Sequence, residues 1–168
     1  LSIADGTPKR AAAQFSQADN MTDRAAALSI LVQRFGTSGA TNDALQAFEA
    51  RYGTDALVMD KWFLIQAMQP GESALEKVRG LMTHRLFSLD NPNRTRSLIG
   101  AFSSGNQTGF NRADGKGYHF FAERILTVDR KNPQLAARLL TAMRSWRSFE
   151  PVRCEHAREA LASIATVA

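Results

Sequence analysis

Apolar residues recur at intervals of three and four along most of the chain, which is the spacing of one buried face of an α-helix. Residues that favour helix N-caps stand before several of these stretches, at Asn20, Asp55, Asn91 and Asn132. The alternation of apolar and polar residues that marks a half-buried strand is almost absent. The pattern therefore predicts an all-α fold of about eight or nine helices, without a sheet.

The connections between most of these helices are short, which favours antiparallel neighbours. A chain of antiparallel helix pairs forms either a bundle or a solenoid of helical hairpins. Thr41 is expected to cap a helix that ends near Gly53, and Pro70-Gly71 is expected to break the chain before the next one. The segment 103–117 is rich in Gly, Ser, Asn and Asp, so it is expected to be one long loop.

Composition is typical of a globular protein, with 44% apolar residues in 168, enough for a single helical domain over residues 1–168. The chain starts at Leu1 without an initiator Met, so we expect it to be a fragment of a longer protein. No apolar run approaches the ~20 residues that span a bilayer, which argues against a membrane protein. Cys154 is the only cysteine, which excludes an intramolecular disulfide and fits a reducing compartment such as the cytoplasm.

The formal net charge of +5 raises the question of nucleic-acid binding. The basic residues are spread along the chain, and most have a carboxylate nearby, as Arg79 has in Glu76. Blocks of basic residues and basic residues interleaved with aromatic ones are both absent. We therefore expect no nucleic-acid partner.

Motifs of catalysis are missing from the sequence. It contains no H-E-x-x-H, G-x-S-x-G or P-loop. His84, His119 and His156 fall in different predicted segments, and Cys154 and His156 are two positions apart, a spacing that faces different directions on a helix. We therefore expect no catalytic residue and no metal site in this chain.

Two arginines, Arg94 and Arg96, stand at the start of the helix that follows Asn91. A helix N-terminus favours anions, and a guanidinium group can grip a carboxylate through two hydrogen bonds. This pair could therefore bind an anionic ligand, or it could form ion pairs with neighbouring helices.

Several segments, in the same order along the chain, resemble the C-terminal domain of bacterial aminopeptidase N, a gluzincin metallo-aminopeptidase. The longest are 19–24, 57–63 and 91–102, and shorter ones lie at 78–81, 114–118 and 132–138. The resemblance implies a HEAT/armadillo-like superhelix of helical hairpins that packs over the active site. It also implies that the zinc and the catalytic residues belong to an upstream domain, which would be a partner of this one.

Within that family, arginine and glutamine side chains project into the channel through which peptide substrates enter. By position these resemble Arg96, Gln134 and Arg138, and we add Arg94 as a further candidate. Gln134 and Arg138 are four residues apart, so they share one helix face. A cationic lining would attract the free carboxylate of a peptide.

A second hypothesis is a stand-alone helical-repeat scaffold that binds a protein partner on its concave face. A domain separated from its enzyme should instead expose an apolar patch where the catalytic domain was seated. In either case the isolated chain is expected to fold, to hydrolyse no aminoacyl anilide and to retain no zinc.

Overall fold

The computed structural model describes residues 6–36 and 38–166, and the helices in them follow one another without an intervening strand. Their bounds are α2 (Lys9–Gln17), α3 (Met21–Phe35), α4 (Gly39–Tyr52), α5 (Ala56–Ala67), α6 (Ala74–Leu81), α7 (Pro92–Thr95), η1 (Arg96–Gly100), α8 (Ala101–Gly105), α9 (Gln107–Phe110), α10 (Lys116–Asp129), α11 (Pro133–Leu140), η2 (Thr141–Met143), η3 (Trp146–Ser148) and α12 (Pro151–Ala165).

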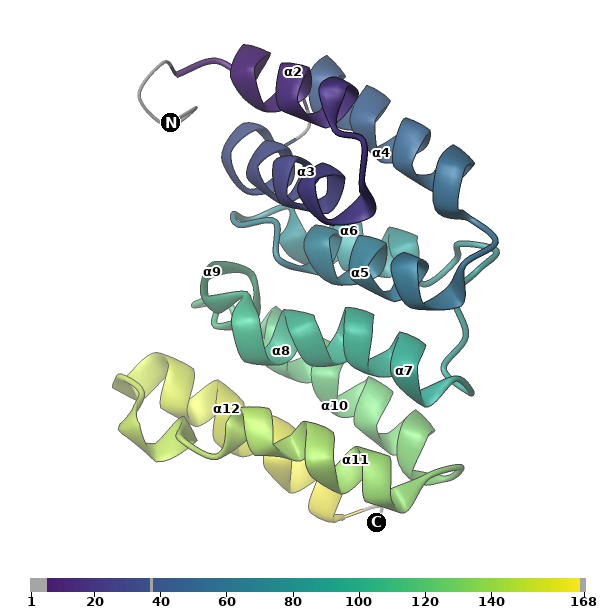
Figure 1. Ribbon diagram of the computed structural model, residues 1–168. Coiled ribbons are helices and arrows are strands. Elements are labelled where there is room, and N and C mark those ends of the chain that lie inside the picture. Colours follow the sequence, from purple (N-terminus) through teal and green to yellow (C-terminus); the bar gives the residue numbers. More distant parts are fainter. Residues whose placement is uncertain (1–5, 37, 167–168) are drawn as a thin grey trace.

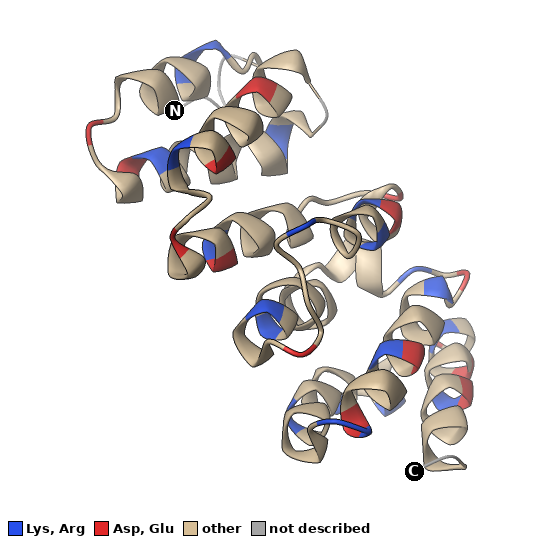
Figure 2. Ribbon diagram, turned by 90° about the vertical axis from the view of Figure 1, so that its right-hand side faces the viewer, with Lys and Arg blue, Asp and Glu red and all other residues tan. Residues whose placement is uncertain are grey.

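The helices are stacked in sequence order from the N-terminal to the C-terminal end of the molecule (Figure 1). Each one packs on helices close to it in the chain order, as α3 does on α2 and α4, α5 does on η1, and α10 does on α11 and α12. This arrangement confirms the predicted all-α superhelix of antiparallel hairpins. Basic and acidic residues are both scattered over the array (Figure 2). Among the described helices, none is both long and apolar enough to cross a membrane.

Most of the predicted helix starts are confirmed in atomic detail. The side chains of Asn20, Asp55, Asn91 and Asn132 each accept hydrogen bonds from backbone N–H groups of the first helical turn. The prediction for Thr41 is wrong, because Ser38 caps α4 and accepts a hydrogen bond from the N–H of Thr41. Thr41 itself is buried, and its hydroxyl donates to a backbone carbonyl of α3.

A continuous helical rod runs from α7 through η1 to α8, and its middle part is not an ordinary α-helix. Residues Arg96–Gly100 form one π-helical stretch, in which hydrogen bonds reach five residues back instead of four. Leu98 and Ile99 of this stretch are completely buried against α5 and the rest of the core. Such insertions into α-helices occur frequently at functional sites.

The expected long loop over 103–117 is wrong in its first half, where α8 continues to Gly105 and α9 follows. Asn106 explains why residues 103–105 and 107–110 are helical and not an extended loop. Its buried amide donates to the carbonyls of Ala67 and Gln69, which lie 2.8 and 2.6 Å away, and its Oδ1 accepts from the N–H of Gly109. One polar side chain therefore joins the end of α5 to the start of α9.

Candidate functional site

The two adjacent arginines of the sequence motif have opposite environments. Arg94 is 5% exposed, and its Nη1 lies 2.9 Å from Oδ1 of Asp60 on α5. Its guanidinium carbon also lies 5.0 Å from the ring centroid of Phe63, a cation–π contact. The Nε and Nη1 atoms make no directed hydrogen bond with described residues. Arg94 therefore ties η1 and α7 to α5, which is the ion-pairing alternative of the sequence analysis.

Arg96 is exposed, and its Nη1 donates a hydrogen bond of 2.7 Å to Oδ1 of Asn93. Gln134 and Arg138 are also exposed, and both lie on α11. Within the described part of the chain, Arg96 and Arg138 form no ion pair with a carboxylate. Both guanidinium groups thus keep most of their capacity to bind an anion.

These three side chains belong to two neighbouring helical segments, Arg96 to the rod and the other two to α11. The rod α7–η1–α8 and α11 lie next to each other in the array (Figure 1). A β-carbon placed on Gly100 would lie 3.2 Å from Cδ2 of Leu139 and 3.8 Å from Cβ of Arg96. Gly100 and Arg96 therefore share the side of the rod that faces α11. The absence of a side chain at Gly100 permits this close approach.

A second polar cluster lies in the turn before α10. Asp114 accepts two hydrogen bonds from Arg112, of 3.0 and 2.7 Å, and one from the N–H of Lys116. The hydrogen bonds from Arg112 hold the pKa of the Asp114 carboxyl far below its usual value. The same guanidinium donates to the carbonyl of Glu72. Nearby, burial raises the pKa of Tyr118 to about 12. This cluster fastens the turn before α10 to the connection between α5 and α6.

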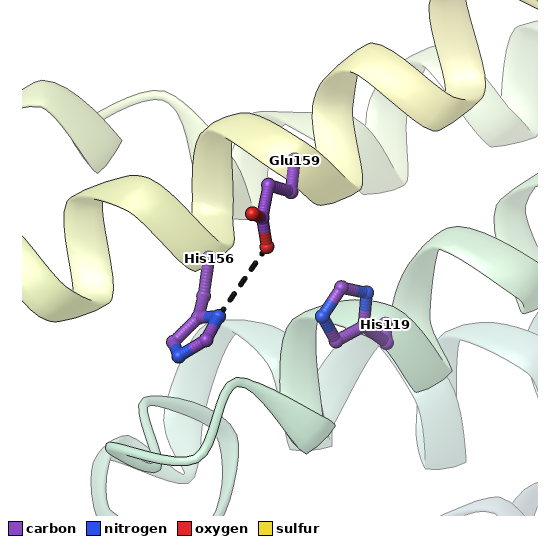
Figure 3. Close-up of side chains that lie close together, drawn as sticks. All are labelled: His119, His156 and Glu159. Atoms are coloured by element: carbon purple, nitrogen blue, oxygen red, sulfur yellow. Dashed lines mark ion pairs between the residues drawn. The ribbon is translucent and has the colours of Figure 1, made fainter.

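A group of potential metal ligands is present that the sequence pattern does not reveal. One nitrogen each of His119 and His156 and one oxygen of Glu159 all lie within 4.8 Å of one another (Figure 3). The histidines fall in different predicted segments, which is why the sequence alone predicts no metal site. The packing of α12 against α10 joins them instead.

Large apolar side chains are exposed at a few positions. Leu57 and Leu64, which are 69% and 45% exposed, lie seven residues apart on α5 and therefore on the same side of that helix. Val152, at the start of α12, is the third large exposed apolar residue in the described ranges. The expected apolar patch is thus limited, among described residues, mainly to one strip of α5.

Comparisons with known proteins agree with this architecture. A family model described as "Domain of unknown function (DUF3458_C) ARM repeats" matches residues 2–168. The chain is 44% identical to aminopeptidase N of Escherichia coli over 149 residues, which are 88% of this chain. It is 38% identical to aminopeptidase N of Haemophilus influenzae over 154 residues, which are 91% of it. The chain spans 17% of the length of each of these two relatives.

A similar solved structure also belongs to an aminopeptidase. Aminopeptidase A of Legionella pneumophila, crystallised in complex with aspartic acid, superposes with a TM-score of 0.89 at 32% sequence identity. The match covers 96% of this chain and 19% of that one. These findings confirm the resemblance on which the sequence analysis relied. The chain belongs to the DUF3458_C family of ARM-repeat domains and is homologous to the C-terminal domain of bacterial aminopeptidase N.

Proposed function

We propose that this chain serves a zinc aminopeptidase, which removes N-terminal amino acids from peptides, as the domain that covers the active site and lines the path of the peptide. The zinc ion and the catalytic residues belong to the upstream domain of the same polypeptide, and we place the enzyme in the cytoplasm. In this role the chain supplies binding groups and excludes bulk water, but performs no bond cleavage itself.

The observation that carries the proposal is the state of Arg96 and Arg138. Both are exposed, and neither is neutralised by a described carboxylate. They lie on η1 and α11, which approach each other at Gly100 and Leu139. Gln134 adds an amide one turn before Arg138, with both donor and acceptor capacity. Such a set suits the free carboxylate and the backbone amides of a short peptide.

Arg94 has a supporting part in this proposal. Its ion pair with Asp60 leaves its guanidinium enclosed between α5 and the rod, where a peptide would have to displace packed side chains to reach it. It therefore holds the backbone from which Arg96 projects. The contribution of Arg94 to peptide binding would be indirect.

The strip formed by Leu57 and Leu64 supports the association with an upstream domain. We assign the catalytic domain as its occupant, because the homologous enzymes are far longer than this chain and require a surface on which the remainder packs. A stand-alone scaffold would need an apolar surface for a separate protein, and no observation favours that reading over the first.

The test uses the full-length enzyme of which this chain is part, with Arg138→Ala and Arg96→Ala as single variants. KM is measured for one short peptide with a free C-terminal carboxylate and for the same peptide as its amide. We expect each variant to raise KM for the free peptide by roughly tenfold, which equals about 1.4 kcal/mol, and to leave the amide nearly unchanged.

Arg130→Ala is the matched control, because Arg130 is also exposed and forms no ion pair in the described part of the chain. Equal KM values for all of these enzymes with the free peptide would refute the role of the arginines. A rise in KM of the same size for peptide and amide would exclude recognition of the carboxylate.

A further inference from the structure

The side chains of His119, His156 and Glu159 come from two helices that pack against each other. His119 lies in the first turn of α10, and His156 and Glu159 lie one turn apart on α12. In Figure 3 the His119 ring faces the space beside the other two side chains. All three offer atoms that bind transition metals, namely imidazole nitrogen and carboxylate oxygen.

The spacing of these atoms is close to that of a coordinated ion. Nδ1 of His156 and Oε2 of Glu159 are 3.4 Å apart. Zinc bonds of about 2.0–2.1 Å in a tetrahedral site place neighbouring ligand atoms about 3.3–3.4 Å apart. The separation of these two atoms therefore already matches the spacing between two ligands of one zinc ion. His119 is exposed, so a change of rotamer can close the remaining gap, from at most 4.8 Å.

Nδ1 of His156 provides an independent observation. This atom is shielded from solvent and makes no hydrogen bond with a described residue. A buried ring nitrogen without a partner carries a free-energy cost that a bound cation would remove. The contact with Glu159 is an ion pair only if the imidazole is protonated.

The ring of His156 packs directly on Gly115, the residue before α10. Gly115 has a φ of +69° and is buried under the imidazole, so that a β-carbon there would lie 2.6 Å from Cγ of His156. A side chain at this position would push the ring away. The left-handed glycine therefore leaves room for the His156 ring, while His119, on the following turn, approaches it from α10.

We propose that these three residues form a binding site for a divalent transition-metal cation, Zn²⁺ above all, which links α10 to α12. Two imidazoles and one carboxylate supply three ligands, and a water molecule completes the tetrahedron on the exposed side. The site lies between α10 and α12, at the C-terminal end of the array. The proposal departs from the expectation, drawn from the sequence, of no metal site in this chain.

The test is a zinc titration of the untagged 168-residue chain, monitored by isothermal calorimetry, with each ligand replaced in turn. We expect saturable one-to-one binding that weakens by more than about tenfold in His119→Ala and in Glu159→Gln. Glu155→Gln and Cys154→Ser are the matched controls on α12, and both should bind zinc as the unaltered chain does. Cobalt(II) should give the visible absorption of a tetrahedral site in the unaltered chain and lose it in both ligand variants.

His156→Ala is expected to abolish binding, but it also removes a ring that packs on Gly115. The proposal is therefore judged on His119 and Glu159, which are exposed and whose replacement leaves the core unchanged. A chain that binds no zinc, or one whose affinity is the same after His119→Ala, would overturn the assignment. Loss of binding in Cys154→Ser would also overturn it, because a thiol would then be a ligand.

Discussion

The N-terminal part of the array, from α2 to α6, and the C-terminal part, from α7 to α12, are built differently. In the first, the helices are uninterrupted α-helices. In the second, a π-helical stretch, short 3-10 turns and the brief helix α9 break the regular pattern. The candidate peptide-binding residues and the histidine cluster all lie in the second part. The comparison indicates that hydrophobic periodicity is enough to determine the helices of the first part. The structure of the second part depends in addition on individual polar contacts.

The largest expected effect concerns the ion pair that joins the two parts. Arg94→Ala leaves Asp60 without its partner and removes the guanidinium from Phe63, so we expect a loss of about 3 kcal/mol or more in the free energy of unfolding. Arg96→Ala, two residues away and exposed, should change it by less than about 0.5 kcal/mol. Urea denaturation of the isolated chain measures both, and similar losses in the two variants would contradict the contrast between them.

Asn106→Ala is expected to have the next largest effect. It leaves the carbonyls of Ala67 and Gln69 and the N–H of Gly109 without the bonds that Asn106 provides. We expect a loss of about 2–3 kcal/mol, measured in the same way. Gln107→Ala, on the exposed side of α9, is the control and should cost less than about 0.5 kcal/mol. A harmless Asn106→Ala would mean that the joint between α5 and α9 does not stabilise the fold.

Asp114→Asn should produce a smaller effect that depends on pH. Because the folded-state pKa of Asp114 is depressed, its contribution to stability is complete above the unfolded-state pKa of about 3.9 and is lost as the pH falls toward the folded-state value. We therefore expect Asp114→Asn to lower Tm at pH 7 and to have a smaller effect near pH 3. Asp43→Asn, at an exposed position that forms no ion pair with a described residue, should show no such change between the two pH values.

The smallest effect on stability is expected for the apolar strip of α5. The double variant Leu57→Ser/Leu64→Ser alters side chains that are 69% and 45% exposed and lie outside the buried core, so Tm of the isolated chain should change less than in the preceding variants. We also expect the isolated chain to self-associate through this strip at high concentration. Sedimentation velocity should show less self-association in the double variant and an unchanged level in Val152→Ser. Weaker packing of the catalytic domain would appear as a lower Tm of the full-length double variant. An unchanged full-length Tm would argue against this strip as the contact with that domain.

Local signals in the sequence predict the helices well, because a cap such as Asn20 or Asp55 acts within one turn. The errors arise where distant residues decide. Asn106 belongs to a stretch with a loop-like composition, yet its partner Ala67 is 39 residues away along the chain. The fold class and its hairpin arrangement were therefore predictable, but the helical structure of the segment around α9 was not.

The candidate sites show the same limit. The family resemblance indicates Arg96, Gln134 and Arg138, but only the packing of α7 on α5 separates the buried Arg94 from the exposed Arg96. The approach of His119 to His156 depends on how α12 crosses α10 and on the space left by Gly115. Neither of these is encoded in a short motif.

The π-helical stretch Arg96–Gly100 also sets the phase of the rod that contains it. One residue of an α-helix corresponds to a rotation of about 100° around the axis. Phe102, just beyond the stretch, meets Phe110 and Phe120 edge-to-face in the core, while Arg96 at its start points outward. Deleting one residue between them would rotate one end of the rod against the other. The number of residues in this stretch is therefore constrained independently of their identity. A one-residue deletion would turn either the Phe102 ring out of the core or the Arg96 guanidinium away from the surface.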